Sequence, residues 1–351
     1  MTDKPEISIV VVNWNTRDLL RACLKSIYAN TDDIAFEVIV VDNASQDDSA
    51  DMVEQEFPDA VLIRSKENLG FTGGYNTGLR RARGDFLMIV NSDLELLPGS
   101  AAGMMDFMKK HPDVGMVGPK LISPDGTVQV NGQRFPTFIR EVLGLTRLYR
   151  NRFIREWHDM NLGPLRTDFT VDAEVDALAG ACLLTTRAVV DAVGLLDERF
   201  FMYYEDVDWC LRVKQAGWKV YYLGDVGVIH VASQSAIKYG LPKANAVLFA
   251  SQYLYWRKHQ GLLRAGALRL LSYWLLAMLC VKRNLRKLNR RPRSAQSCRS
   301  ECSQASLSDA EYASTRRTSR MACASSWTWK WSRSGTESRR GRPTSRIPPT
   351  A

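Results

Sequence analysis

Carboxylates and a histidine occur in the sequence at positions where they could carry out chemistry together. Asp93 closely follows an apolar run, and His230 closes another. Glu205 and Asp206 begin a cluster of three carboxylates within four positions, flanked by aromatic residues. Carboxylate oxygens at a strand end are typical ligands of Mg²⁺ or Mn²⁺. Crowded carboxylates beside aromatic rings can have the shifted pKa that a general base requires. These residue types therefore predict a divalent-cation site and a catalytic base.

The cation site has more than one possible set of ligands. Asn91 with Asp93, or Asp93 with Glu95, would place two oxygen donors one residue apart. His230 is the only histidine at a predicted strand end in the body of the chain, and it is placed to complete the site. A lone histidine is more often structural, and acidic residues at a helix start also stabilise the helix dipole. Both of these alternatives remain open.

Two further segments predict a nucleotide site. Asp42 ends an apolar run about 30 residues after the first run ends, where doubly wound folds place an acid that contacts a ribose or base. Residues 68–78 are rich in glycine, Gly73 included, and enter a helix whose N-terminal amides would approach a diphosphate. No Gly-x-Gly-x-x-Gly turn follows the first run, which argues against a dinucleotide cofactor. An ordinary turn at Asp42 and a capped helix after the glycines are the alternatives.

Alternating strands and helices would position these residues. The predicted strands are apolar, β-branched runs at 7–12, 38–41, 61–63 and 86–90. The helices predicted between them are 17–28, 49–57 and 75–83. This alternation predicts an α/β fold with a doubly wound, mainly parallel sheet that binds ligands at the carboxyl ends of its strands. The polar residues that follow these strands are Asn13, Asn15, Asp42, Asn43, Asn91, Ser92 and Asp93.

The rest of the predicted catalytic domain, which spans 1–238, is less regular. A hairpin is expected at 124–126, whereas the aromatic and arginine-rich stretch 135–166 gives no clear pattern. The later predicted elements are strand-like segments at 171–178 and 181–185, and helices near 187–193 and from 206 to 217.

The C-terminal third contains a helical segment and a tail. Residues 241–287 are predicted to be helical, with an uncharged apolar run at 270–281. A run of roughly 12 residues forms about 18 Å of helix, which is too short to span a bilayer. Because basic residues flank it, we expect 239–289 to be an amphipathic segment at the membrane surface; a helix packed on the domain is the alternative. Residues 290–351 are rich in Ser and Arg without periodicity, which predicts a disordered tail that also resembles the out-of-frame end of a gene.

Composition and charge narrow the class of protein. With 351 residues, 45% of them hydrophobic, the chain can form a globular enzyme. The net charge of +9 is uneven, because residues 282–351 carry 17 basic and 4 acidic side chains and the rest has a net charge of −4. Nucleic acid is therefore not an expected partner, although binding through the basic tail stays open. Seven cysteines without paired spacing, and no apolar leader, favour a cytoplasmic location.

Taken together, these segments resemble family 2 glycosyltransferases of the GT-A fold over residues 7–235. The resemblance rests on 10–15, on Val-Val-Asp-Asn-Ala-Ser at 40–45, on 68–78, on Asn-Ser-Asp at 91–93, and on Tyr-Glu-Asp-Val-Asp-Trp at 204–209 with His230. The subgroup that the chain resembles most is the rhamnosyltransferase-like branch that extends lipid-linked glycans. Residues 67–71, 200–203 and 216–218 carry that likeness.

The resemblance implies roles for individual residues. Asp42 would contact the nucleotide base, with Asn13 and Asn15 lining the same pocket and Asn68 and Asn76 near the ribose or diphosphate. With the residues singled out above, the expected donor-binding set is Asn13, Asn15, Asp42, Asn68, Gly73, Asn76, Asn91 and Ser92.

The resemblance also implies the catalytic machinery. Asp93 corresponds to the metal-binding acid of the family's Asp-x-Asp motif, whose first acid is Asn91 here. Asp206, preceded by Glu205, would be the base of the Glu-Asp motif, and His230 a metal or phosphate ligand. Asp206 would deprotonate an acceptor hydroxyl, which attacks the anomeric carbon in one inverting displacement while Mg²⁺ or Mn²⁺ stabilises the departing nucleoside diphosphate.

The substrates follow from the branch that the chain resembles. The expected donor is dTDP-rhamnose, and the expected acceptor is a polyprenol-linked or growing cell-surface glycan at the inner face of the cytoplasmic membrane. A sugar nucleotidyltransferase and an inert nucleotide-sugar or glycan-binding protein are the alternatives.

Overall fold

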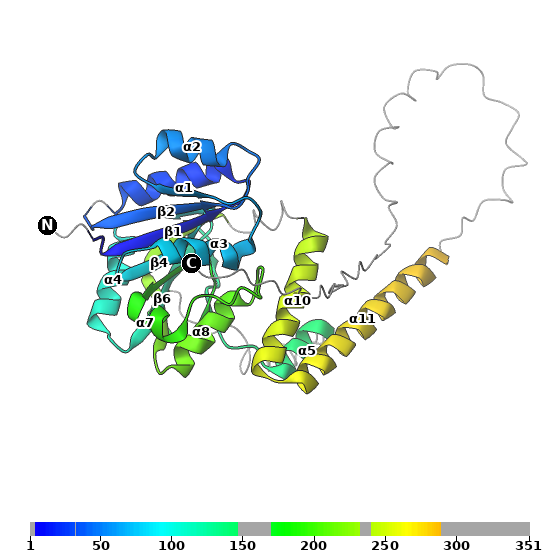
Figure 1. Ribbon diagram of the computed structural model, residues 1–351. Coiled ribbons are helices and arrows are strands. Elements are labelled where there is room, and N and C mark those ends of the chain that lie inside the picture. Colours follow the sequence, from blue (N-terminus) through cyan, green and yellow to red (C-terminus); the bar gives the residue numbers. More distant parts are fainter. Residues whose placement is uncertain (1–3, 32, 147–169, 232–239, 289–351) are drawn as a thin grey trace, which may run out of the picture. The chain divides into compact units, whose positions relative to one another are not determined.

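The computed structural model describes residues 4–31, 33–146, 170–231 and 240–288 (Figure 1). The strands are β1 (Ile7–Asn13), β2 (Phe36–Asp42), β3 (Val61–Arg64), β4 (Phe86–Asn91), β5 (Leu94–Leu96), β6 (Val114–Ile122), β7 (Val128–Gln129), β8 (Gly132–Gln133), β9 (Ala173–Glu174), β10 (Ala177–Leu178), β11 (Cys182–Thr186) and β12 (Lys219–His230). The helices are α1 (Arg17–Ala29), α2 (Ser49–Glu56), α3 (Gly70–Arg81), α4 (Ser100–Lys110), α5 (Phe138–Thr146), α7 (Arg187–Val193), α8 (Glu205–Gln215), α10 (Leu241–His259) and α11 (Leu262–Leu288). The predicted tail, 290–351, and much of the stretch 135–166 lie outside the described residues.

A ten-stranded mixed sheet organises the described part of the chain. Its main order is β3-β2-β1-β4-β11-β6-β12-β5. Strand β1 is parallel to β2 and β4, and β12 is parallel to β6, whereas β11 is antiparallel to its neighbours β4 and β6. The predicted class, a GT-A-type doubly wound mixed sheet that is mainly parallel, is confirmed.

Helices cover both faces of this sheet. Alternate residues of each central strand therefore pack into two separate cores, one on each face. In β1, Val10 packs into a core shared with α3, α7 and α8. Its neighbours Ile9 and Val11 pack into a second core, shared with α1, α2 and α4. This is why the central strands read as continuous apolar runs. With both faces covered, a ligand can reach the sheet only at its ends.

Glycines shift two helix boundaries away from those predicted. Residues 241–287 form two helices, α10 and α11, interrupted at Gly261, whose φ of 86° lies in the left-handed region. Helix α3 begins at Gly70 (φ 74°), before the predicted start at 75. A Cβ at Gly70 would lie 2.4 Å from the backbone oxygen of Phe201, so only glycine allows this close approach.

The last two helices differ in how much of their surface is covered. Tyr255 and Trp256 of α10, each 1% exposed, and Ala265 and Leu268 of α11 belong to the core that holds α8. Farther along α11, five large apolar side chains are between 51% and 71% exposed: Leu270, Tyr273, Trp274, Met278 and Val281. Within the described residues, no helix is long and apolar enough to cross a membrane.

By its contacts the chain divides into compact units 1–286 and 287–351. Helix α10 and most of α11 therefore belong to the same unit as the sheet. Of the second unit, only the last two residues of α11 are described.

Candidate active site

A cavity of about 290 Å³ lies where several strands end and two helices begin. Strands β1, β4 and β12 reach it with their carboxyl ends, and α3 and α8 with their N-termini. The predicted site residues that line it are Asn68, Asn91, Ser92, Asp93, Glu205, Asp206 and His230. Residues more than 130 positions apart in the sequence thus share one cavity, at the end of the sheet where doubly wound folds bind ligands.

Asp93 and His230 lie side by side in the wall of this cavity. Strand β5 pairs with β12, so that His230 lies opposite Leu94 and the amide of Val231 donates to the carbonyl of Asp93. The imidazole Nε2 is 3.5 Å from Asp93 Oδ1, and both side chains are nearly buried. The sheet therefore holds a carboxylate and an imidazole in fixed positions at the cavity wall.

The chemistry of this pair fits a divalent cation. A carboxylate oxygen and an imidazole nitrogen are both ligands of Mn²⁺, and Mg²⁺ prefers the oxygen. Among the described residues there is no cluster of three or more His, Cys, Asp or Glu suited to a metal. Two protein ligands are nonetheless what Mg²⁺ sites use when substrate phosphates and water complete the coordination. Asp93 and His230 would then hold a cation that is shared with a phosphorylated ligand.

Asp206 is oriented by backbone amides at the N-terminus of α8. Its two carboxylate oxygens accept hydrogen bonds from the amides of Gly180, at 2.9 Å, and Val207, at 2.8 Å. Burial raises the pKa of Asp206, although these amide hydrogen bonds act in the opposite direction. A partly buried carboxylate with a raised pKa, fixed in orientation at a cavity wall, has the properties of a general base.

Glu205 lies beside Asp206 and is more deeply buried. Burial raises the pKa of Glu205 well above its ordinary value, and the negative charge of Asp206 raises it further. Its Oε2 is buried and has no hydrogen-bond partner among the described residues. Because Asp206 accepts two amide hydrogen bonds, the shared negative charge belongs on Asp206 and the proton on Glu205.

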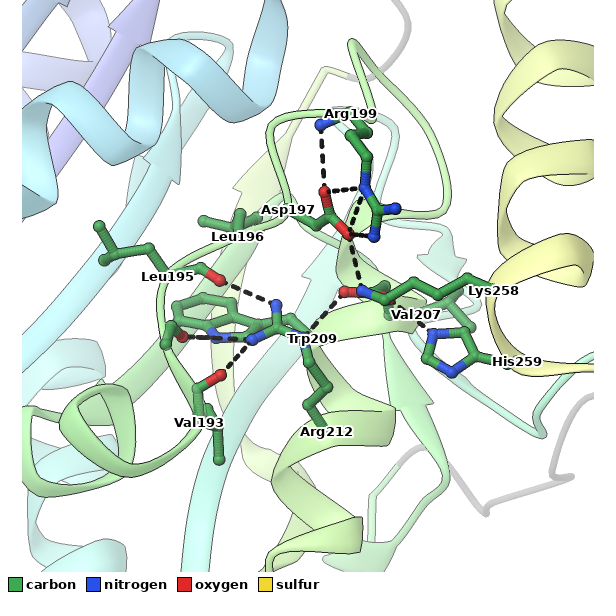
Figure 2. Close-up of polar contacts among 12 residues, drawn as sticks. Val193, Leu195, Leu196, Asp197, Arg199, Val207, Trp209, Arg212, Lys258 and His259 are labelled. Carbon is green, nitrogen blue, oxygen red and sulfur yellow. Dashed lines mark hydrogen bonds and ion pairs between the residues drawn. The ribbon is translucent and has the colours of Figure 1, made fainter.

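A network of buried charges fixes the helix that carries Asp206. Asp208 is fully buried and accepts from Lys258 at 2.5 Å, from His259 at 2.7 Å and from Arg212 at 2.9 Å. Lys258 also pairs with Asp197, and the guanidinium of Arg212 donates to backbone carbonyls at 193–195 (Figure 2). Helix α8 is thereby tied both to α10 and to the loop that follows α7.

Asp208→Asn should lower the free energy of unfolding by about 3 kcal/mol, because it removes a fully buried negative charge that the part-buried Arg212 and Lys258 share. Burial would raise the pKa of Asp208, but hydrogen bonds from His259 and Lys258 and the charge of Arg212 outweigh it, and the pKa is lowered. A lowered pKa in the folded state stabilises the protein above the pKa of the unfolded state, and this is lost as pH falls through the folded value. Urea unfolding at several pH values, with exposed Asp106→Asn as control, measures both effects. Equal stability of the two variants at pH 7 would contradict this account.

The predicted nucleotide-binding residues at the ends of β1 and β2 form a cluster behind the cavity wall. Asn13 donates to Asp42 at 3.2 Å and to Ser45 at 3.1 Å, and Asp42 accepts from the amide of Ser45. Asn15 adopts a positive φ of 55° and accepts from the amide of Gln46. The structure brings Asn13, Asn15 and Asp42 together, although none of them lines the cavity itself.

The remaining donor-binding candidates lie on or before α3. Asn68 lines the cavity and accepts from the amide of Gly70. Gly73 and Asn76 do not line it. Asn76 is 1% exposed and its amide group bonds to the backbone of Leu196 and to Glu198, so it holds the loop after α7 against α3.

Sequence reasoning left out several residues of the cavity wall. They are apolar or aromatic: Val12, Trp14, Phe71, Ala179, Phe201, Met202 and Tyr203. Tyr203 and Tyr204 have φ values of 71° and 67°, a strained conformation that often accompanies function. The aromatic run before the carboxylates was a signal for this wall. Asn43, which was expected at the strand end after 38–41, also lines the cavity.

Comparison with known proteins identifies the family. Residues 8–167 match the profile of Glycosyl transferase family 2. The chain carries a glycosyl transferase family 2 domain. It is 29% identical to N-acetylglucosaminyl-diphospho-decaprenol L-rhamnosyltransferase of Mycobacterium tuberculosis, over 83% of this chain and 97% of that protein. It is 25% identical to the low-salt glycan biosynthesis hexosyltransferase Agl10 of Haloferax volcanii, over 64% of this chain and 67% of that protein.

These similarities confirm the family 2 resemblance and its rhamnosyltransferase-like branch. A further relative, the O-antigen biosynthesis protein RfbC of Myxococcus xanthus, is 28% identical over 73% of this chain and 20% of that protein. The protein is thus a glycosyltransferase, and its relatives include a rhamnosyltransferase and an O-antigen biosynthesis protein. The nucleotidyltransferase and inert-binder alternatives are set aside.

Proposed function

We propose that this glycosyltransferase moves L-rhamnose from dTDP-rhamnose to a hydroxyl of a polyprenol-diphosphate-linked glycan, with inversion at the anomeric carbon. The observation that carries the proposal is one cavity that holds an amide-oriented Asp206 and the Asp93–His230 pair. The transferred sugar and the acceptor are those in the name of the Mycobacterium tuberculosis relative, whose match covers 83% of this chain and 97% of that protein. The dTDP donor is the one that the rhamnosyltransferase-like resemblance implies.

In the proposed reaction, Asp206 removes the proton from the acceptor hydroxyl as the oxygen attacks the anomeric carbon. The bond to the nucleoside diphosphate breaks in the same displacement, so no glycosyl-enzyme intermediate forms. Asp93 and His230 would hold a divalent cation, which would supply charge stabilisation for the leaving diphosphate. The N-terminus of α3, beside Asn68, directs the positive end of its helix dipole toward the same diphosphate, although the amides of Gly70 and Phe71 already donate to Asn68 and Phe201.

The nucleoside is assigned to the cluster of Asn13, Asn15 and Asp42. These residues lie next to the cavity, and Asp42 keeps acceptor capacity on its carboxylate oxygens beyond the bonds it already accepts. Asn91 and Ser92 contribute polar groups to the cavity wall nearer the diphosphate. Gly73 and Asn76 act indirectly, by shaping α3 and holding the adjoining loop.

Ligand-induced stabilisation tests the donor. The thermal unfolding of the purified protein is measured with dTDP, UDP and GDP and their sugars, with and without Mn²⁺. A ligand at 100 times its dissociation constant adds about 2.7 kcal/mol to the free energy of unfolding. We expect the largest Mn²⁺-dependent shift with dTDP compounds. A larger shift with UDP or GDP compounds would replace the proposed donor, and no shift with any of them would overturn the proposal.

The same proposal places the protein peripherally at the inner membrane surface through α11. Leu263 is 90% exposed, and Leu270 and Trp274 are 71% and 58% exposed, next to the exposed Arg264 and Arg269. An apolar surface beside basic residues suits an anionic lipid surface, where a lipid-linked acceptor would be found.

Leu270→Glu with Trp274→Glu should reduce co-sedimentation with phosphatidylglycerol vesicles at least tenfold, because two apolar contacts are lost and two negative charges are added. Ile139→Glu with Val171→Glu is the matched control, since those side chains are 53% and 56% exposed outside α11. Equal vesicle binding by the two double variants would refute the role of α11.

A further inference from the structure

The predicted hairpin at 124–126 forms and delivers Gln129 to His230. Ser123 and Thr127 close the turn through a backbone hydrogen bond, with Gly126 at φ 85°. Strand β7 then pairs with β6, so that Gln129 lies opposite Leu121. From there its side chain reaches the last residue of β12.

Gln129 bonds to His230 at two points. Its amide nitrogen donates to the backbone carbonyl of His230 at 2.8 Å and to Ser123 Oγ at 2.9 Å. Its Oε1 lies 2.8 Å from the imidazole Nδ1. Every polar atom of the Gln129 amide therefore has a partner, and turning the side chain over would place Oε1 against the carbonyl of His230, which only accepts.

These contacts determine where the imidazole proton is. A backbone carbonyl only accepts, so the amide nitrogen of Gln129 belongs beside it and Oε1 belongs beside the ring. Because Oε1 also only accepts, Nδ1 must carry the hydrogen. In the neutral ring Nε2 then has a free lone pair, and this lone pair faces Asp93 Oδ1 at 3.5 Å.

We propose that Gln129 is a positioning residue that holds His230 in the Nδ1–H form, so that Nε2 can bind a divalent cation together with Asp93. Two electron-pair donors at 3.5 Å with no proton between them attract a cation. This inference rests on the proposed metal-dependent function and extends it to a residue outside the cavity wall. Such partners of metal-binding histidines typically change metal affinity 10–100-fold.

The test combines two readouts. Nitrogen NMR of the metal-free protein, with the signal assigned through His230→Gln, reports the tautomer of His230. Titration of Mn²⁺ in the presence of dTDP or UDP, followed by the electron paramagnetic resonance signal of free Mn²⁺, reports affinity. Gln129→Leu removes the hydrogen bonds at similar size, and Gln215→Leu, at an exposed position ending α8, is the control.

We expect the Nδ1–H tautomer in the natural protein, and a 10–100-fold weaker Mn²⁺ affinity in Gln129→Leu with loss of that tautomer preference. An Nε2–H tautomer in the natural protein would overturn the inference. So would equal Mn²⁺ affinity of Gln129→Leu and the natural protein, and this result would leave the proposed function intact. If the natural protein binds no Mn²⁺ with either nucleotide, the metal-dependent function itself is overturned, and the inference with it.

Discussion

Asp206→Asn should lower kcat by about a thousandfold while leaving donor binding unchanged. General base catalysis typically contributes 10²–10⁴-fold, and asparagine keeps the size of the side chain without its basicity. The asparagine oxygen can keep one of the two amide hydrogen bonds, because Gly180 and Val207 donate to different oxygens of Asp206, and thermal unfolding of the variant checks that the fold is retained. The exposed Asp191→Asn on α7 is the control. A kcat within tenfold of the natural enzyme would exclude Asp206 as the base.

The same residue predicts the pH dependence of the reaction. Burial raises the pKa of Asp206 above the ordinary value of an aspartate. The base must be unprotonated, so kcat/KM should fall as pH drops through this raised pKa, at a higher pH than an exposed aspartate would give. In Asp206→Asn, the residual kcat/KM should not show this fall at low pH. The same fall in the variant would mean that another group causes the pH dependence.

Asp93→Ala should reduce kcat/KM by at least a hundredfold and abolish the Mn²⁺ dependence of donor binding. A bound divalent cation contributes several kcal/mol to stabilisation of the leaving group, and each 1.4 kcal/mol corresponds to tenfold. Glu95→Ala is the informative control, because the sequence allowed Glu95 as a partner ligand but the side chain does not line the cavity. If Glu95→Ala loses more activity than Asp93→Ala, the assignment of the cation site is wrong.

The fold was predictable where local patterns decide it. Continuous apolar runs such as 7–12 identify strands covered on both faces, and polar residues after them identify the ligand-binding end. Periodicity cannot detect a glycine that adopts a positive φ, which is why the helical segment 241–287 was not divided at Gly261. Periodicity also cannot predict that β11 lies antiparallel between β4 and β6, because that pairing depends on the packing of the whole sheet.

The site was predictable only in part, for a related reason. Asp93, Asp206 and His230 belong to recognisable motifs, and the structure brings them into one cavity. Lys258, whose bond to Asp208 spans 50 positions, belongs to none, and neither does Gln129, which lies 101 positions from His230. Such contacts exist only after tertiary folding, so no local signal in the sequence reports them.

The central claim, that this glycosyltransferase transfers a sugar by a single inverting displacement, is tested most directly by the anomeric configuration of the product. The enzyme is incubated with dTDP-rhamnose, Mn²⁺ and a polyprenol-diphosphate N-acetylglucosamine acceptor, and the new linkage is determined by NMR. The account predicts one dTDP released per sugar transferred and a product of inverted configuration. A retained configuration, or release of dTDP without transfer to the acceptor, would contradict it.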